Sequence, residues 1–191
     1  MSTIVQKPAR TFKLPALRSL GALADCEPVI VVDTREQEPL CFERLQSRAG
    51  SLVSGDYSIA GMESLFSVER KTIPDLIGCC VGENRERFER ELHRLRGFRF
   101  KRLLIVGTEE QILQGLYNHT NIRPRAVWAT LCAFEVRYEV PLVFRASPAL
   151  AARQIESWAY WYSREMVCVA NEMRRALEVQ TEAVGKPSPA P

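Results

Sequence analysis

The chain has 191 residues, of which 46% are hydrophobic and 26% are charged, and its formal net charge is +3 at pH 7. These values are close to average globular usage and predict one domain with a sizeable core. No apolar run approaches the ~18 residues that span a bilayer, and the N-terminus lacks the apolar segment of a signal peptide. We therefore expect neither a membrane protein nor a secreted one, but an intracellular protein, in the cytoplasm or at the nucleoid if the source is a bacterium or a phage.

The six cysteines are scattered and form no C-x-x-C pair, and the two histidines are not at metal-ligand spacing from them. A zinc site built on cysteines is therefore not expected. In a chain of this length, such cysteines are typical of a reducing compartment, where each acts as a small buried apolar side chain.

The two ends of the chain differ in composition from its middle. Residues 1–26 combine basic residues with prolines, which predicts a flexible basic arm. Residues 179–191 have the composition of a disordered tail. The folded domain is expected between them, over residues 27–178.

The middle of the chain begins with two strand patterns and a helix pattern. The β-branched run at residues 29–32 predicts a strand that is buried on both faces. Residues 65–71 predict a second strand. A narrow apolar stripe on a charged background then predicts a helix over residues 84–96.

The alternation continues to the end of the predicted domain. A third strand is expected over residues 101–107, a helix over 124–136 and a short fourth strand over 141–145. Ser147-Pro148 combines a capping residue with a first-turn proline, which predicts the start of a long helix. Strands separated by helices indicate an α/β fold with a central mostly parallel or mixed sheet flanked by helices.

The second predicted strand carries three consecutive charged residues. Side chains alternate along a strand, so Glu69 and Lys71 project together, while Arg70 projects from the other side. Phe66 and Val68 share the side of Arg70 and mark it as the core side. The Arg70 guanidinium is therefore expected to need a buried partner.

Two further carboxylates are expected near Glu69. The gap between Asp56 and Glu69 fits two hairpin arms and a turn, which would place the two carboxylates side by side. Asp33 follows a buried strand at its C-terminal end, where open α/β sheets place their ligands. Carboxylates gathered in this way repel one another unless a cation lies between them, and hard carboxylate oxygens favour Mg²⁺ or Mn²⁺. Lys71 then supplies a point charge, and Arg35 a phosphate clamp.

These residues follow a recognisable pattern. Gly55-Asp56, Glu69-Arg70-Lys71 and Asp75 resemble the G-D-x(n)-E-R-K-x(3)-D signature of the XPF-type structure-specific endonucleases. The stretch 31–36, VVDTRE, is similar to the upstream V-D-x-R-E element of that family, and the resemblance extends over roughly residues 28–165. It implies a restriction-endonuclease-like core and metal-dependent hydrolysis of phosphodiester bonds in DNA, on branched, flap or fork substrates in repair or recombination.

The resemblance also assigns roles to residues. It implies that the catalytic residues are Asp33, Asp56, Glu69 and Lys71, of which the first three would bind the metal. It implies supporting roles for Arg35, Glu36, Arg70 and Asp75. For Asp75, a purely structural role at the start of a helix remains the alternative, and either Glu36 or Asp75 is the expected partner of Arg70. The sequence resembles a stand-alone nuclease domain, without the helicase or helix-hairpin-helix modules of many relatives.

A basic segment and an aromatic segment point to partners. Residues 85–102 hold eight Lys and Arg against three Glu, so a DNA-tracking surface is expected at Arg85, Arg87, Arg90 and Arg94. The alternative is a solvated helix with i, i+4 ion pairs. In the last helix, Trp158 and Tyr162 are expected in the core and Trp161 against a second subunit, since relatives commonly form homodimers.

Two other functions remain compatible with the sequence. A non-catalytic DNA-binding or scaffold partner of the same family would be expected to have lost acidic or lysine positions of the signature, and these positions are all present here. A nuclease that acts on RNA, or on modified nucleic acid, is not distinguished by these residues.

Overall fold

The computed structural model describes residues 27–117 and 122–184. The chain divides into two compact units, one spanning Glu27–Met166 and one that contains the described segment 167–184. Only the first contains strands among the described residues. The predicted arm, residues 1–26, and the end of the predicted tail, residues 185–191, lie outside the description, whereas helix α6 (Pro148–Val184) continues beyond residue 178.

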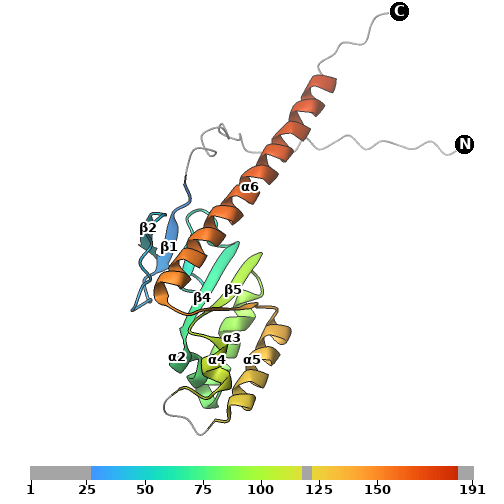
Figure 1. Cartoon of the computed structure of the whole chain (residues 1–191). Coiled ribbons are helices and arrows are strands. Elements are labelled where there is room, and N and C mark those ends of the chain that lie inside the picture. Colours follow the sequence, from blue (N-terminus) through green and yellow to red (C-terminus); the bar gives the residue numbers. More distant parts are fainter. Residues whose placement is uncertain (1–26, 118–121, 185–191) are drawn as a thin grey trace, which may run out of the picture. The chain divides into compact units, whose positions relative to one another are not determined.

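The unit Glu27–Met166 is built on one mixed sheet (Figure 1). Its six strands lie in the order β2-β1-β3-β4-β5-β6. Strand β3 is antiparallel to both its neighbours, and the other three pairs are parallel. The strands are β1 (Ile30–Asp33), β2 (Ser47–Gly50), β3 (Tyr57–Ile59), β4 (Phe66–Thr72), β5 (Phe100–Val106) and β6 (Leu142–Arg145).

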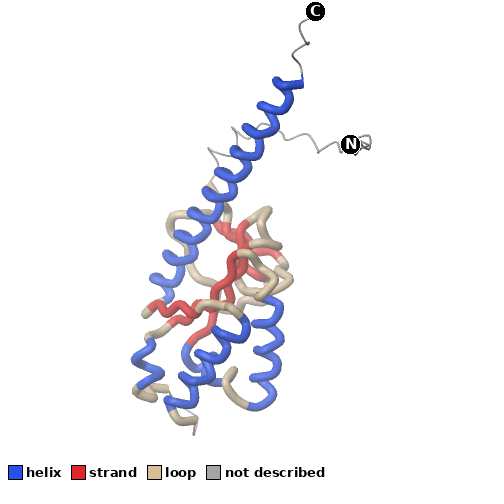
Figure 2. The backbone as a smooth tube through the Cα atoms, turned by 90° about the vertical axis from the view of Figure 1, so that its right-hand side faces the viewer, coloured by secondary structure: helices blue, strands red, loops and turns tan. Residues whose placement is uncertain are grey.

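Helices cover both faces of this sheet (Figures 1 and 2). One core cluster joins one face of β5 to four helices: α2 (Ile73–Gly78), α3 (Gly82–Leu95), α4 (Glu109–Leu113) and α5 (Pro124–Tyr138). The other cluster joins β1, β3 and β4 to the first turns of α6, through Ala152, Ile155 and Ala159. The predicted α/β class, a sheet flanked by helices, is confirmed.

Strand β4 is central in the sheet, so both of its sides are covered, and not only the side of Phe66 and Val68 that the sequence marks as the core side. Phe66, Ser67, Val68 and Glu69 are all buried, because helices cover both faces of the strand. Phe66 and Val68 pack in the cluster under α6, as the alternation predicts. The opposite side, which holds Glu69 and Lys71, faces α3 rather than open solvent. These two charged residues therefore lie between the sheet and that helix.

No helix in the described part of the chain has both the length and the apolar character needed to cross a membrane.

Candidate active site

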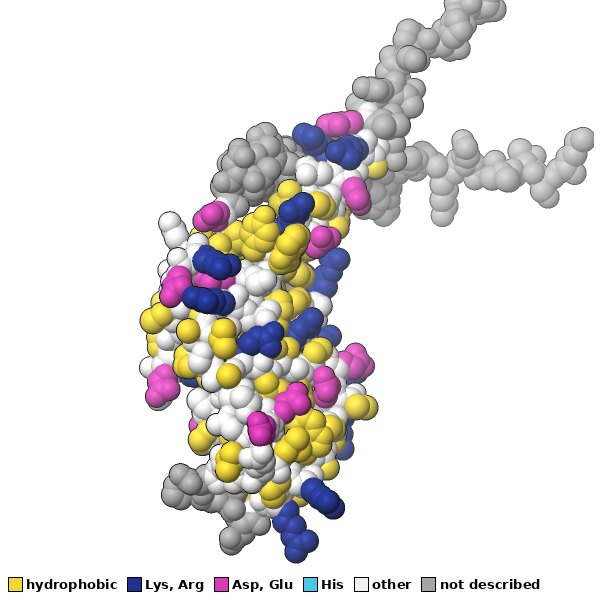
Figure 3. Space-filling model, viewed as in Figure 1, with side chains coloured by type: hydrophobic (Ala, Val, Ile, Leu, Met, Phe, Trp, Pro, Cys, Tyr) yellow, Lys and Arg dark blue, Asp and Glu magenta, His cyan; other side chains and the backbone are white. Residues whose placement is uncertain are grey.

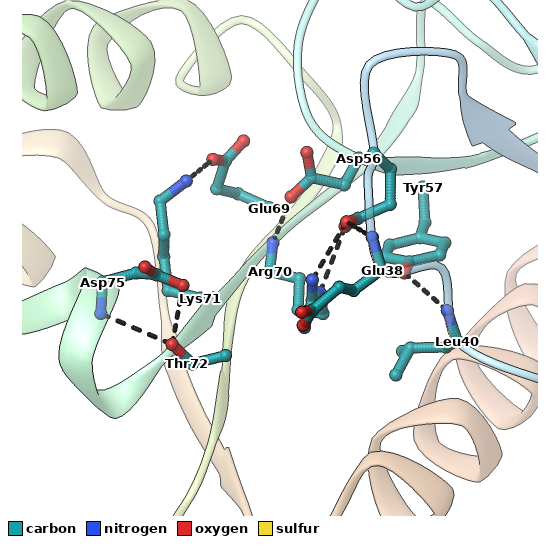
Figure 4. Close-up of polar contacts among 10 residues, drawn as sticks. Glu38, Leu40, Asp56, Tyr57, Glu69, Arg70, Lys71, Thr72 and Asp75 are labelled. Atoms are coloured by element: carbon teal, nitrogen blue, oxygen red, sulfur yellow. Dashed lines mark hydrogen bonds and ion pairs between the residues drawn. The ribbon is translucent and has the colours of Figure 1, made fainter.

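Asp56 lies beside Glu69 because a tight turn holds it against β4. Gly55 adopts φ +80°, and a Cβ atom at this position would overlap the Ser67 hydroxyl, so the turn requires glycine. The Asp56 N–H donates to the Val68 carbonyl at 2.9 Å, and the Arg70 N–H donates to Asp56 Oδ2 at 2.7 Å. Figure 4 shows the two carboxylates on the same side of the strand.

Lys71 is fixed by contacts on two sides. Its ammonium donates to Glu69 Oε1 at 2.5 Å, which confirms that the two side chains project from the same face of β4. The same Nζ lies 5.5 Å from the centre of the Phe88 ring on α3, within the range of a cation–π contact. A lysine held in this way presents a positive charge at a set position.

A cavity of about 580 Å³ opens beside these residues. Asp56, Lys71 and Arg70 line it from the sheet, and Arg35 and Glu36 from the segment after β1. The remaining lining residues are Gln37, Glu38, Pro74, Asp75, Gly78, Cys79, Asn84, Arg87, Phe88 and Glu91. The Glu69 side chain, only 6% exposed, lies beneath the surface of this cavity and is linked to it by Lys71.

Burial changes the acidity of the two carboxylates. It raises the pKa of Asp56 to about 7, and the neighbouring Glu69 charge adds to the effect. Burial also raises the pKa of Glu69, although Lys71 opposes the change. Burial alone would lower the pKa of Lys71, but the charge and the hydrogen bond of Glu69, together with the charges of Asp56 and Glu91, raise it. Lys71 is therefore a cation at neutral pH, and the two carboxyl groups gain from a further positive charge nearby.

The Asp33 carboxylate is already fully engaged by hydrogen bonds. Oδ1 accepts from the Arg35 N–H at 2.8 Å and from Arg35 Nε at 2.7 Å. Oδ2 accepts from Arg35 Nη2 at 3.1 Å and from the Leu52 N–H at 2.7 Å. These contacts lower the pKa of Asp33, chiefly through Arg35, and the side chain is 1% exposed. Asp33 does not line the cavity, whereas Arg35 does, with 70% of its side chain exposed.

Arg70 binds Glu36 on the opposite side of β4 from Glu69. Nη2 donates to Glu36 Oε1 at 2.9 Å and Nε donates to Oε2 at 3.1 Å, and both side chains are nearly buried. Of the two expected partners, Glu36 is therefore the one observed. Asp75 instead accepts a 2.6 Å hydrogen bond from the Thr72 hydroxyl, which caps α2, and it lines the cavity from the first turn of that helix (Figure 4).

Comparison with known proteins assigns the chain to a family. The ERCC4 domain family matches residues 32–157, which include the acidic turn, strand β4 and the cavity-lining helix α3. The chain belongs to the ERCC4 domain family. The expectation of an XPF-type nuclease domain is thereby confirmed. No curated protein matches the sequence.

Two solved structures share the fold of this ERCC4 domain. XPF from Aeropyrum pernix is 22% identical, with a TM-score of 0.54 over 69% of this chain and 60% of that one. XPF from Aeropyrum pernix in complex with DNA is also 22% identical, with a TM-score of 0.57 over 72% of this chain and 66% of that one. This chain thus spans less than two thirds of the XPF chains that it matches, and at this identity the similarity concerns the fold.

The donor set of the ERCC4 domain suits a hard divalent cation. Within residues 27–117 and 122–184, no three His, Cys, Asp or Glu side chains are placed to share one ion. Mg²⁺ is commonly held by one or two carboxylates together with waters and substrate phosphate. Asp56 and Glu69 supply two such carboxylates, both with raised pKa values that a cation would reverse. The residues present therefore fit Mg²⁺ or Mn²⁺.

Helix α3 carries the predicted basic residues on different parts of its surface. Arg87 lines the cavity and pairs with Glu91 at 3.6 Å, whereas Arg85 pairs with Glu89 at 3.0 Å. Arg90 and Arg94 are exposed, and neither forms an ion pair with another described residue. The i, i+4 ion pairs therefore neutralise only the first half of the basic set.

Three α3 residues line the cavity although their sequence pattern does not predict them as site residues: Asn84, Phe88 and Glu91. Phe88 belongs to the apolar stripe that predicts the helix, and Glu91 lies one turn after it. Since residues three apart share a helix face, a carboxylate at position 91 had to lie at the border of the buried stripe. The position of the Glu91 carboxylate relative to β4 depends on how α3 packs on the sheet, which the local sequence pattern does not predict.

Proposed function

We propose that this ERCC4 domain is a divalent-metal-dependent DNA endonuclease that hydrolyses phosphodiester bonds at the cavity beside Asp56 and Lys71. The observation that carries the proposal is that two carboxyl groups of raised pKa, the partly buried Asp56 and the buried Glu69, lie with the Lys71 cation at a cavity that Arg35 and Arg87 also line. Negative phosphate is attracted by the rim, and the carboxylates provide the ligands that a divalent cation needs.

Asp56 and Glu69 would hold the Mg²⁺ or Mn²⁺ ion. When bound, such an ion stabilises negative charge on the reacting phosphoryl group and makes a bound water more acidic. For Asp33, the resemblance implies a third ligand, but its four hydrogen bonds from Arg35 and Leu52 support a positioning role, holding Arg35 at the rim. Its direct binding to metal would require Arg35 to release it.

The cationic side chains then act on the phosphate. Lys71, held by Glu69, places its ammonium where charge develops during hydrolysis. Arg35 is exposed at the rim and can form paired hydrogen bonds with phosphate oxygens. Arg70 and Glu36, which also line the cavity, support the site, since their ion pair fixes the strand that carries Glu69 and Lys71. Asp75 fixes the start of the helix that follows.

The DNA backbone would follow α3 away from the cavity. Arg87 lies at the cavity, and the exposed Arg90 and Arg94 continue the basic surface along the helix. Phosphate contacts of this kind carry no sequence preference, so we propose that DNA structure directs the enzyme, with branched, flap or fork DNA as substrate in repair or recombination.

A homodimer is the proposed assembly. Trp161 is 54% exposed and Tyr160 is 47% exposed, and their rings form an edge-to-face pair on α6. Figure 3 shows hydrophobic side chains exposed among charged ones on the face that it views. Trp158 and Tyr162 instead pack against the core, as predicted. If light scattering finds a monomer at all concentrations, the dimer is excluded; a Trp161→Ser variant should dissociate it.

A cleavage assay with labelled substrates tests the proposed activity. Duplex, flap, fork and single-stranded DNA, together with an RNA of the same sequence, are incubated with Mg²⁺ or Mn²⁺. Wild-type protein should cleave branched DNA and Asp56→Asn should not, whereas a Glu63→Gln control, an acid whose only described ion pair is with Arg48, should remain active. If the wild-type protein binds these substrates but cleaves none, the non-catalytic scaffold function is favoured; if it cleaves only RNA, the substrate proposal is wrong.

A further inference from the structure

A second cavity, of about 350 Å³, lies between the loop after β1 and the first turns of α6. Its loop wall includes Pro39, Leu40 and Cys41, and its helix wall includes Ala149 and Ala152. The volume is within the range of about 300–1,000 Å³ that is typical of small-molecule sites. Apolar walls of this kind suit a flat, weakly polar ligand.

Glu156, which also lines this cavity, has an unused acceptor atom. The residue is 3% exposed, and its Oε1 accepts from two backbone N–H groups, those of Arg44 at 2.6 Å and Leu45 at 3.1 Å. Its other oxygen, Oε2, is buried and has no hydrogen-bond partner among the described residues. Buried polar atoms are nearly always satisfied, so an unpartnered carboxylate oxygen points to a donor that comes from a ligand.

The second cavity adjoins the proposed active site. Glu38 and Arg70 line both cavities, so only the chain segment around Glu38 separates them. A nucleic acid that places a phosphate beside Lys71 would therefore have nearby nucleotides within reach of the second cavity.

The charges of this cavity select against phosphate. Glu38, Glu43 and Glu156 contribute acidic groups, while Arg70 is paired with Glu36, and Arg153 with Glu43 at 3.6 Å. Unpaired acceptors in an acidic surrounding favour a neutral ligand that offers N–H donors. The bases of a nucleic acid meet this requirement, and they differ at the exocyclic position: adenine and cytosine carry an amino donor where thymine carries an acceptor oxygen, so thymine offers only its ring N–H.

We propose that the cavity between the 38–43 loop and α6 binds an unpaired nucleobase of the substrate, through an amino group that donates to Glu156 Oε2. The inference rests on the proposed DNA substrate and adds a site that recognises a nucleotide outside the duplex. It predicts a base preference in a protein whose other DNA contacts are with phosphates.

Glu156→Gln is the informative variant. The two backbone N–H donors require an oxygen at the Oε1 position, so the glutamine amide is oriented with its NH₂ group at the position of Oε2. The acceptor thus becomes a donor while the loop contacts remain. Ala149→Phe, an exposed position in the first turn of α6, fills the cavity without a change in the core, and Leu150→Phe, exposed but outside the lining, is its control.

The test measures binding by fluorescence anisotropy, with EDTA present so that no cleavage occurs. The probes are forks whose single-stranded arm is all dT, or carries one dC at each position in turn. At one position near the junction, wild-type protein should bind the dC fork about tenfold more tightly than the dT fork. Glu156→Gln should reverse this order, since thymine O4 accepts from an amide, and Ala149→Phe should abolish it while Leu150→Phe keeps it.

Two results would overturn the inference. One is equal binding of all forks by the wild-type protein, and the other is a base preference that both Glu156→Gln and Ala149→Phe leave unchanged. Cleavage is measured separately with Mg²⁺. A protein that shows the base preference but cleaves nothing would contradict the nuclease proposal and support the base-binding site. Cleavage without a base preference would support the nuclease proposal and contradict the base-binding site.

Discussion

Arg70 and Glu36 form a nearly buried ion pair behind strand β4, with Nη2 and Oε1 2.9 Å apart. The pair explains why a third charge lies between Glu69 and Lys71 in the sequence. Glu69 and Lys71 pair with each other on one side of β4, and Arg70 projects from the other side and ties the strand to Glu36 in the segment after β1. In the Glu-Arg-Lys run, Glu69 and Lys71 therefore belong to the proposed catalytic group, and Arg70 has a structural role.

Removal of Arg70 should destabilise the domain. Arg70→Met leaves the Glu36 carboxylate nearly buried without its partner and should lower the free energy of unfolding by about 3 kcal/mol. Urea denaturation gives the value. Arg87→Met, at an exposed ion pair, is the matched control and should cost less than about 1 kcal/mol.

The double variant separates the pair from the packing of its parts. Combining Arg70→Met with Glu36→Gln removes the unpaired charge, so part of the stability lost in Arg70→Met should return. Strictly additive losses would show that the two residues act independently, contrary to the contact.

The stability of the metal-free protein should depend on the ionisation of Asp56. Its pKa is raised from 3.8 to about 7, so the folded state favours the protonated form, and stability falls as pH rises from about 3.8 to about 7 and levels off above that. Asp56→Asn removes this loss. With EDTA present, the variant should match the wild type near pH 4 and be more stable by about 4 kcal/mol near pH 9.

Thermal unfolding at a series of pH values checks this expectation. A Glu63→Gln control should follow the wild-type curve, since Glu63 is partly exposed and, within residues 27–117 and 122–184, forms an ion pair with Arg48 alone. If Asp56→Asn destabilises the protein equally at every pH, the raised pKa of Asp56 does not describe the molecule.

Divalent ions should bind at Asp56 and Glu69 and release protons. Because a cation favours the ionised carboxylates, Mn²⁺ binding by calorimetry should weaken below pH 7 and its heat should depend on the ionisation enthalpy of the buffer. Asp56→Asn and Glu69→Gln should each reduce the affinity at least tenfold. Asp33→Asn should reduce it less, since Asp33 is occupied by Arg35 and Leu52. A larger effect of Asp33→Asn than of Asp56→Asn would place the ion elsewhere.

Arg90 and Arg94 should contribute to DNA affinity without sequence preference. Charge reversal of both should weaken binding to all sequences alike and lower the slope of log K against log salt by about 2. The control is charge reversal of Arg174 and Arg175, which lie on α6. If the α3 variant keeps the wild-type affinity and salt slope, Arg90 and Arg94 are solvated surface only.

The main elements could be predicted because their patterns are local. Strand β4 and helices α3 and α5 follow from apolar runs and stripes, and alternation along β4 separates Arg70 from Glu69. Strand β2 has no such pattern: Ser47–Gly50 is largely exposed and becomes a strand only by pairing with β1. Strand β3, with three residues, is too short for periodicity to detect.

The site could be predicted in part for the same reason. The proximity of Asp56 and Glu69 follows from one turn within a hairpin, which the spacing fixes. The bonding of Asp33 depends on the Leu52 N–H, 19 residues away, and on how Arg35 folds back. These contacts arise in the tertiary structure, so the sequence places Asp33 near the metal ligands but does not show that its oxygens are occupied.

The most direct test of the account is single-turnover cleavage of a labelled fork with Mg²⁺ by Lys71→Met. The expected cleavage rate is at least ~100-fold below that of the wild type, because the ammonium that Glu69 holds beside the cavity is lost, with metal-free DNA affinity and fold retained. Cleavage by Lys71→Met at the wild-type rate would contradict it and would place the chemistry away from the Asp56, Glu69 and Lys71 cluster.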